Sequence, residues 1–177
     1  MTHPRRTRSN TKPSAPSTPA SPDCNSPPSS FTSDICIGTW NQQTRFSDSS
    51  AIDLALTHNM DILAIQEPNP QLADSSTHHH ASFLTNAKSA GYAAFTTAHT
   101  ITLVKQSTLM PYHRATHKII QDGRLQPIIF TPSPSTNIAV INTYAYQRSH
   151  KSYSSSSLSL KNQFDALITS LKSTYSN

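Results

Sequence analysis

The chain has 177 residues, enough for one domain and too few for two comfortable ones. Hydrophobic residues make up 34% and charged residues 13%, both below the usual shares of about 45–50% and about 25%. No apolar run is long enough to span a membrane, and no hydrophobic segment has the form of a secretory signal. Two cysteines cannot build a disulfide framework. We therefore expect an intracellular protein that is not secreted, with no membrane anchor and no disulfide-linked partner.

The net charge of +5 is unevenly distributed along the chain. Residues 75–177 carry nine Lys and Arg against two Asp, whereas residues 34–74 carry one Arg against six acids. A basic second half favours an anionic partner such as nucleic acid. A solvated basic surface with no partner is the alternative.

Residues 1–33 are rich in Pro, Ser and Thr and have almost no apolar side chains. Such a segment cannot bury enough surface to offset its ordering entropy, so we expect a disordered tail. Its Pro-Arg-Arg-Thr-Arg start fits a nucleic-acid arm, a nuclear signal or a solubilising linker with no further role.

Order is expected to begin near Asp34, where a strand covers 34–41. Apolar residues at helical spacing predict a helix over 49–59, and the continuously apolar run 61–67 predicts a strand buried on both faces. A second helix is expected over 80–90, with Gly91 at the glycine position that follows a helix.

Strand patterns dominate from residue 92 onward, and a helix closes the chain. The expected strands cover 92–97, 100–105, 114–121, 124–131 and 137–146, with a hairpin turn at 122–123. Pro127 argues for an edge strand or a bulge, because proline lacks the N–H that a central strand needs. A Ser-rich loop over 149–157 leads to a helix over 158–175. This order predicts an α/β or α+β domain over 34–177.

Three polar residues lie where expected strands end, which is where α/β sheets usually bind ligands. Glu67 is the only glutamate in the chain, and a carboxylate at that position suits Mg²⁺; an exposed loop acid is the alternative. Asn41 either caps a turn or binds a phosphate oxygen. Tyr144 is either a half-buried aromatic or a phosphate donor. The consecutive histidines 78–80 are expected on a loop, where they cannot all face one metal ion.

Three segments match one family in order and at plausible distances. They are Ile-Gly-Thr-Trp-Asn (37–41), Asp-Ile-Leu-Ala-Ile-Gln-Glu-Pro (61–68) and Ile-Ala-Val-Ile-Asn-Thr-Tyr-Ala (138–145). Together they resemble the endonuclease/exonuclease/phosphatase family, which includes deoxyribonuclease-I-like enzymes. The Gln-Glu-Pro-Asn ending is most similar to the endonuclease domains of non-LTR retrotransposons.

The resemblance implies a fold, a cofactor and residue roles. The fold would be a partial four-layer α/β-sandwich of the deoxyribonuclease-I-like type, with Mg²⁺ or Mn²⁺ as cofactor and DNA as partner. Glu67 matches the metal-binding glutamate, Asn41 the asparagine beside it, and Tyr144 the tyrosine that contacts the scissile phosphate. Arg148 matches a basic, substrate-binding residue that follows this tyrosine.

The family's later Gly-Asp-Phe-Asn-like and Ser-Asp-His-like segments are absent from the sequence. We therefore expect a truncated member, ancestrally a Mg²⁺-dependent DNA phosphodiester hydrolase and with little or no activity alone. Whether it is an enzyme is left open. The alternatives are a non-enzymatic basic nucleic-acid-binding module and a fragment of a same-fold lipid or inositol phosphate phosphodiesterase. Truncation also predicts that the inner face of the first sheet meets water and associates with a partner.

Overall fold

The computed structural model describes residues 34–43, 48–116, 123–146 and 151–175. The N-terminal segment 1–33 and Arg148 lie outside the described residues, so the expectations for them are not addressed below. The described strands are β1 (Ile37–Asn41), β2 (Ile62–Gln66), β3 (Tyr92–Thr96), β4 (Thr100–Lys105), β5 (His113–Thr116), β6 (Leu125–Ser133) and β7 (Thr136–Thr143). The helices are α1 (Asp48–Thr57), α2 (Pro70–Ala73), α3 (His78–Ser89) and α4 (Tyr153–Tyr175), with a 3₁₀ turn, η1 (Met110–Tyr112).

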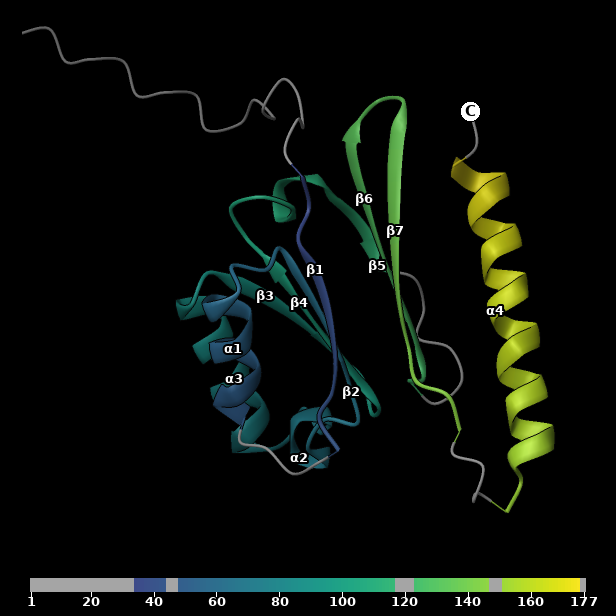
Figure 1. The fold of residues 1–177 in the computed structure, drawn as a ribbon, viewed down its shortest axis with the longest axis horizontal. Coiled ribbons are helices and arrows are strands. Elements are labelled where there is room, and N and C mark those ends of the chain that lie inside the picture. The colour runs from purple at the N-terminus through teal and green to yellow at the C-terminus, as the bar shows by residue number, and fades with distance from the viewer. Residues whose placement is uncertain (1–33, 44–47, 117–122, 147–150, 176–177) are drawn as a thin grey trace, which may run out of the picture.

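The described part is a mixed α/β fold with two sheets and four helices. Sheet A has the strand order β1-β2-β4-β3, with β1 and β2 parallel and the other neighbours antiparallel. Sheet B is an antiparallel sheet of order β5-β6-β7. Figure 1 shows α1 and α3 on the outer side of sheet A and α4 on the outer side of sheet B.

Three apolar clusters hold these layers together. The first joins α1 and α3 to sheet A and includes Ile52, Leu63 and Phe83. The second lies between the sheets and consists of Ile62, Val104, Leu109, Tyr112, Ile128 and Phe130. The third joins sheet B to α4 through Ile129, Leu167 and Leu171. In the second cluster His113 contacts the rings of Phe95 and Phe130, and burial lowers its pKa below the usual value.

Where the structure describes them, the expected elements are confirmed in type and order, with some differences. Residues 117–121 of an expected strand and residue 122 of the expected hairpin turn lie outside the described residues, and the 3₁₀ turn η1 was not predicted. The short helix α2 was not predicted, and α4 begins at Tyr153, inside the segment expected to be a serine-rich loop. The histidines 78–80 form the first turn of α3 and do not lie on a loop. His80 is buried, and its ring Nδ1 donates to the Leu72 carbonyl, which ties α3 to α2.

The prediction that Pro127 lies in an edge strand is wrong. Pro127 lies in β6, the central strand of sheet B, opposite Ile141 of β7. The described pairing of β6 with β5 ends at Ile128, so Pro127 has a partner strand on one side only. Proline is tolerated there because no second ladder in the described part needs its missing N–H.

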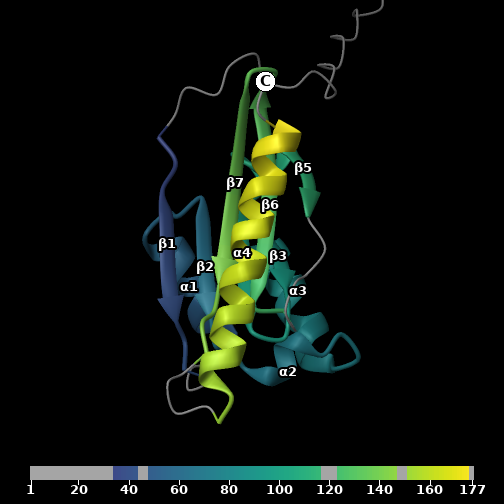
Figure 2. The ribbon, with the colours of Figure 1, turned by 90° about the vertical axis from the view of Figure 1, so that its right-hand side faces the viewer.

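The prediction that the inner face of sheet A meets water is wrong for β2 and β4. Ile62 and Val104 on this face are fully buried under sheet B. The outer strand β1 differs, because its Ile37 is 58% exposed. Sheet A therefore extends beyond sheet B by one strand, and Figure 2 shows β1 lying to one side of β7.

No helix in the described ranges is both long and apolar enough to cross a membrane. Cys36 is exposed and makes no disulfide within the described part of the chain.

Gly123 precedes β6 with a φ of +83°, and its carbonyl accepts a hydrogen bond from the Thr97 hydroxyl at 2.6 Å. A Cβ at this position would lie 2.9 Å from the Ala98 nitrogen. Gly91 has an almost equal φ of +84° but open space around a Cβ. A side chain substituted at either position would therefore meet the same backbone strain, but the two positions differ in steric room.

We expect Gly123→Ala to lower the free energy of unfolding by at least about 1 kcal/mol more than Gly91→Ala, because only the former adds a backbone clash. Urea unfolding followed by circular dichroism measures both. Equal losses for the two variants would contradict this description of the turn.

Candidate functional site

The site is built where β1 and β2 end. These strands are parallel, so their carboxyl ends lie at one edge of sheet A, and Asn41 pairs in register with Gln66. Glu67 follows directly. Two of the three polar residues singled out in the sequence are therefore placed next to each other by strand pairing alone.

Glu67 has a φ of +50°, in the left-handed region that non-glycine residues rarely adopt. Its backbone N–H donates to the His99 carbonyl at 3.2 Å, which fixes the turn against the segment before β4. Such a conformation costs about 1–3 kcal/mol and persists where the surroundings impose it. A strained acid at a strand end is a common property of functional sites.

Tyr144 joins the site from the other sheet. It lies one residue beyond β7, and its backbone N–H donates to the Arg124 carbonyl at 2.9 Å. Its phenol donates a hydrogen bond to the Glu67 carboxylate. The structure thus brings together two predicted residues that are 77 positions apart in the chain.

A buried amide two residues before Tyr144 positions this contact. The Asn142 side chain is 2% exposed, and its Nδ2 donates to the carbonyls of Ile65 at 3.2 Å and Ile101 at 2.9 Å. Its Oδ1 accepts from Gln66 Nε2 at 2.8 Å. Nδ2 also lies within hydrogen-bond distance of the Thr102 hydroxyl, at 3.1 Å. One side chain of sheet B is therefore bonded to four residues of sheet A. Sequence reasoning missed it because an Asn in a strand gives no local sign of burial.

Arg124 lies beside the phenol of Tyr144. Its guanidinium carbon is 4.9 Å from the ring centre of Tyr144 and 4.0 Å from that of Tyr146, a cation–π arrangement. Its Nη1 is buried and has no hydrogen-bond partner among the described residues. A buried N–H of a permanent cation without an acceptor is costly, and an anion placed there would remove the cost.

Sequence reasoning named Arg148 as the basic residue of the site and passed over Arg124. Arg148 lies outside the described residues, so its role stays a prediction. The only sequence signal for Arg124 was its position directly after the glycine of the expected hairpin turn, Gly123. The ring of His99 also approaches Tyr144, with ring centres 6.0 Å apart.

Asn41 has the first of the two roles that the sequence left open, that of a turn cap, and its binding of a phosphate oxygen stays a prediction. Its Oδ1 accepts the Gln43 N–H at 3.0 Å, as a turn-capping residue does. It also lines a cleft of about 360 Å³ together with Tyr144. We call this space the β1/β7 cleft; its lining is Ile37, Gly38, Thr39, Asn41, Ala64, Gln66, Val140, Ile141, Asn142, Thr143 and Tyr144.

The donor set at Glu67 suits only a metal ion that completes its shell elsewhere. No group of three or more His, Cys, Asp or Glu side chains able to hold a metal ion occurs among the described residues. Mg²⁺ is commonly bound through one or two carboxylates, several waters and a substrate phosphate. A single carboxylate beside an unpaired guanidinium N–H fits that mode and does not fit a zinc or calcium cage.

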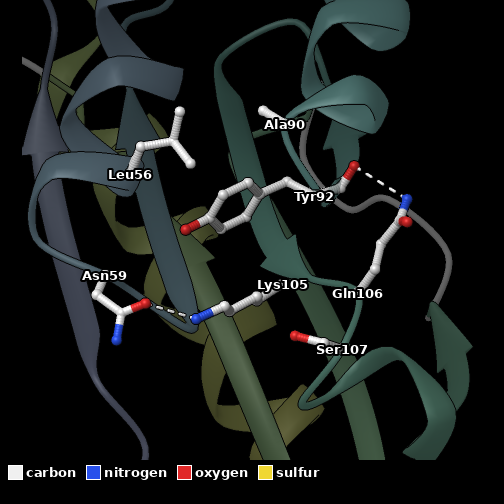
Figure 3. Close-up of a pocket in the computed structure, with 8 residues that line it drawn as sticks. Leu56, Asn59, Ala90, Tyr92, Lys105, Gln106 and Ser107 are labelled. Carbon is white, nitrogen blue, oxygen red and sulfur yellow. Dashed lines mark hydrogen bonds between the residues drawn. The ribbon is translucent and has the colours of Figure 1, made fainter.

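A larger cavity of about 540 Å³ lies at the opposite end of sheet A (Figure 3). Its centre is the Tyr92 ring, which Figure 3 shows between Leu56 and Lys105. The Lys105 ammonium donates to Asn59 Oδ1 at 2.6 Å, and Gln106 donates to the Tyr92 carbonyl at 3.2 Å. Two pairs of polar groups in this cavity are therefore bonded to each other, and none of its lining residues belongs to the Glu67 site.

Comparisons with protein-family models, with curated proteins and with solved structures give no match for this chain. The site is therefore interpreted from its own geometry.

We expect Asn142→Leu to lower the free energy of unfolding by about 2 kcal/mol or more, because it leaves buried carbonyls and the Gln66 amide without their partner. Thr143, the exposed neighbour, provides a matched control, since Thr143→Ala should change the free energy of unfolding by less than about 0.5 kcal/mol. Urea denaturation measures both. A loss no larger than that of the control would show that the amide is not a structural anchor.

Proposed function

We propose that this chain binds a nucleic-acid phosphodiester together with Mg²⁺ at the edge formed by Glu67, Tyr144 and Arg124. The proposal includes a fold of the deoxyribonuclease-I-like type and membership of the endonuclease/exonuclease/phosphatase family. The observation that carries it is the buried, unpartnered Nη1 of Arg124 beside the Tyr144–Glu67 hydrogen bond. Two helix-flanked sheets packed face to face are consistent with such a fold.

Each residue has a role that follows from its contacts. Arg124 donates Nη1 to a phosphate oxygen and stays oriented by the two tyrosine rings. Glu67 would hold Mg²⁺ through one carboxylate oxygen. Bound Mg²⁺ supplies positive charge that offsets the negative charge on the phosphate. Tyr144 orients the carboxylate through its hydroxyl, and Asn41 lines the adjoining cleft, where its amide reaches a neighbouring phosphate.

We expect the site to bind the phosphodiester but to hydrolyse it slowly or not at all. Hydrolysis also needs an oriented water and a group that accepts its proton. The described residues placed at this edge bring one carboxylate, one phenol, one guanidinium and the imidazole of His99. The family's later acidic and histidine segments are missing from the sequence, and losing one member of a catalytic set commonly lowers the rate by about 10³-fold or more. We therefore propose a phosphate-binding protein with weak or no nuclease activity.

A metal-independent basic nucleic-acid-binding module is the second candidate, favoured by the excess of Lys and Arg in residues 75–177. This module differs from the proposed Mg²⁺-dependent site in two measurable ways. Binding would not need Glu67 or Mg²⁺, and it would depend steeply on salt. A phosphodiesterase acting on lipid or inositol phosphates would use the same site, with a different preferred ligand.

The test is binding of a short labelled DNA duplex to the full chain, in Mg²⁺ and in EDTA, followed by fluorescence anisotropy. We expect Arg124→Met to weaken Mg²⁺-dependent binding at least about tenfold, because a charge-assisted hydrogen bond to phosphate is lost. Lys172→Met removes the same charge from the exposed side of α4 and should weaken binding no more than about twofold. Glu67→Gln should abolish the difference between Mg²⁺ and EDTA.

Nicking of supercoiled plasmid in Mg²⁺ measures turnover in parallel. Robust nicking that is lost in Glu67→Gln would show that the site is a working nuclease and contradict the expectation of weak activity. Equal binding by Arg124→Met and Lys172→Met would contradict the proposed phosphate site and leave the metal-independent module as the better description. Tighter binding of inositol phosphate than of DNA would identify the wrong ligand class.

A further inference from the structure

The two sheets do not cover each other completely. The ring of His113 in β5 lies 5.2 Å from that of Phe95 in β3, so these strands face each other. Thr102 of β4 donates to Gln126 of β6 at 2.6 Å. Asn142 places β7 over β2 and β4. Among the described residues, nothing of sheet B lies over β1.

The inner face of β1 is consequently open. Ile37 projects on the same side of sheet A as the fully buried Ile62 of β2 but is 58% exposed. The β1/β7 cleft occupies the space beside it. Apart from the Tyr144 phenol, the lining of this cleft contains no ionisable side chain. Ile37 and Val140 extend the apolar interior between the sheets into this opening, whose lining also includes uncharged polar side chains such as Gln66. Figure 2 shows β1 lying to one side of β7.

The edge of β7 lacks the features that usually prevent strand addition. In the described part β7 is the last strand of sheet B, and its eight residues include no charge and no proline. The opposite edge strand, β5, has Arg114 and a break in register between His113 and Ala115. Charges and bulges protect natural sheet edges from pairing with another chain. Among the described residues, sheet B is therefore protected at its β5 edge and has no strand paired to its β7 edge.

We propose that the outer edge of β7 binds an extended polypeptide strand, which lies over β1 and closes the β1/β7 cleft. Neighbouring strands lie about 4.8 Å apart, so a strand added to β7, which lies over β2 and β4, comes to rest over the outer strand of sheet A. Main-chain hydrogen bonds to β7 give the affinity, as in other cases of strand addition. This surface adjoins the proposed phosphate site, because the cleft shares Asn41 and Tyr144 with it.

The chemistry of the cleft defines the partner. Its inward side chains must be uncharged and apolar, because they meet Ile37, Val140 and Ala64. β-branched residues suit the pleated surface best. The partner is therefore an extended segment of alternating pattern, with β-branched residues on the face that meets β1.

A second copy of this chain does not fit as the partner. Pairing of its β7 with β7 would bring its β2 about one strand spacing from the first β2. That position is already occupied by β1, which pairs with β2. Because sheet A extends beyond sheet B by the strand β1, a single added strand fits better than a symmetrical dimer.

The test uses a fluorescent, end-capped peptide with the sequence Thr-Asn-Ile-Ala-Val-Ile-Asn-Thr, which is that of β7, added to the full chain. We expect saturable binding by anisotropy. Ile37→Lys should weaken it at least about tenfold, because the added strand would bury an unpaired charge. Leu158→Lys is the matched control, since Leu158 of α4 is also 58% exposed and lies away from the cleft.

Two further variants keep the test decisive. Thr39→Lys places the same charge two residues along the same exposed face of β1 and should weaken binding by a similar factor. It replaces Ile37→Lys as the test variant if Ile37→Lys unfolds at a lower urea concentration than the unmodified chain. A peptide with Lys in place of both inward residues, Ile138 and Val140, should not bind. Absence of binding by the unmodified peptide, or equal binding by Ile37→Lys and Leu158→Lys, would overturn the proposal. Dimerisation in sedimentation that Ile37→Lys abolishes would also overturn it, because the occupant would then be a second copy.

Discussion

The Asn142 side chain is the interaction on which the arrangement of the site depends. Its amide donates to carbonyls of two neighbouring strands of sheet A and accepts from Gln66, so all its polar atoms are bonded inside the sandwich. A buried amide is stable only with these partners, which makes other registers of β7 costly. A shift of one residue would turn every side chain of β7 to the opposite face. The phenol of Tyr144 would then leave Glu67, and the site would not form.

The remaining geometry follows from how that register places charge. Tyr144 lies between the Glu67 carboxylate, to which it donates, and the Arg124 guanidinium, which lies over its ring. Aromatic rings orient a guanidinium without using its hydrogen-bond donors. Arg124 therefore keeps a buried Nη1 for which the described part of the chain has no acceptor. A cation oriented by the ring of Tyr144, whose hydroxyl bonds the Glu67 carboxylate, suits a ligand that presents phosphate and a divalent ion together.

The sequence predicted the elements with strong local patterns. The strand at 61–67 was recognisable because it is apolar on both faces, and Gly91 marked the end of α3 because its φ is positive. Glu67 and Tyr144 were found because they lie at expected strand ends, where α/β sheets usually bind ligands, and because Glu67 is the only glutamate in the chain. Their contact with each other depends on sheet stacking, which no local pattern encodes.

Other features were missed for the same reason. Burial of Asn142 and Arg124 arises only when the two sheets meet. Pro127 was misjudged because proline is excluded by a neighbouring ladder, and the described ladder of β5 stops one residue short. The early start of α4 shows that a run of serines becomes helical when the residues after it pack on a sheet. The inner face of sheet A was expected to meet water, but sheet B covers that face of β2 and β4.

The most direct measurement is anomalous diffraction from crystals of the full chain grown with Mn²⁺ and a short DNA duplex. The account predicts one anomalous peak at about 2.0–2.2 Å from a Glu67 carboxylate oxygen and from a phosphate oxygen, with Arg124 Nη1 bonded to the same phosphate. A phosphate bound elsewhere, with Nη1 still unpartnered and no peak at Glu67, would contradict it.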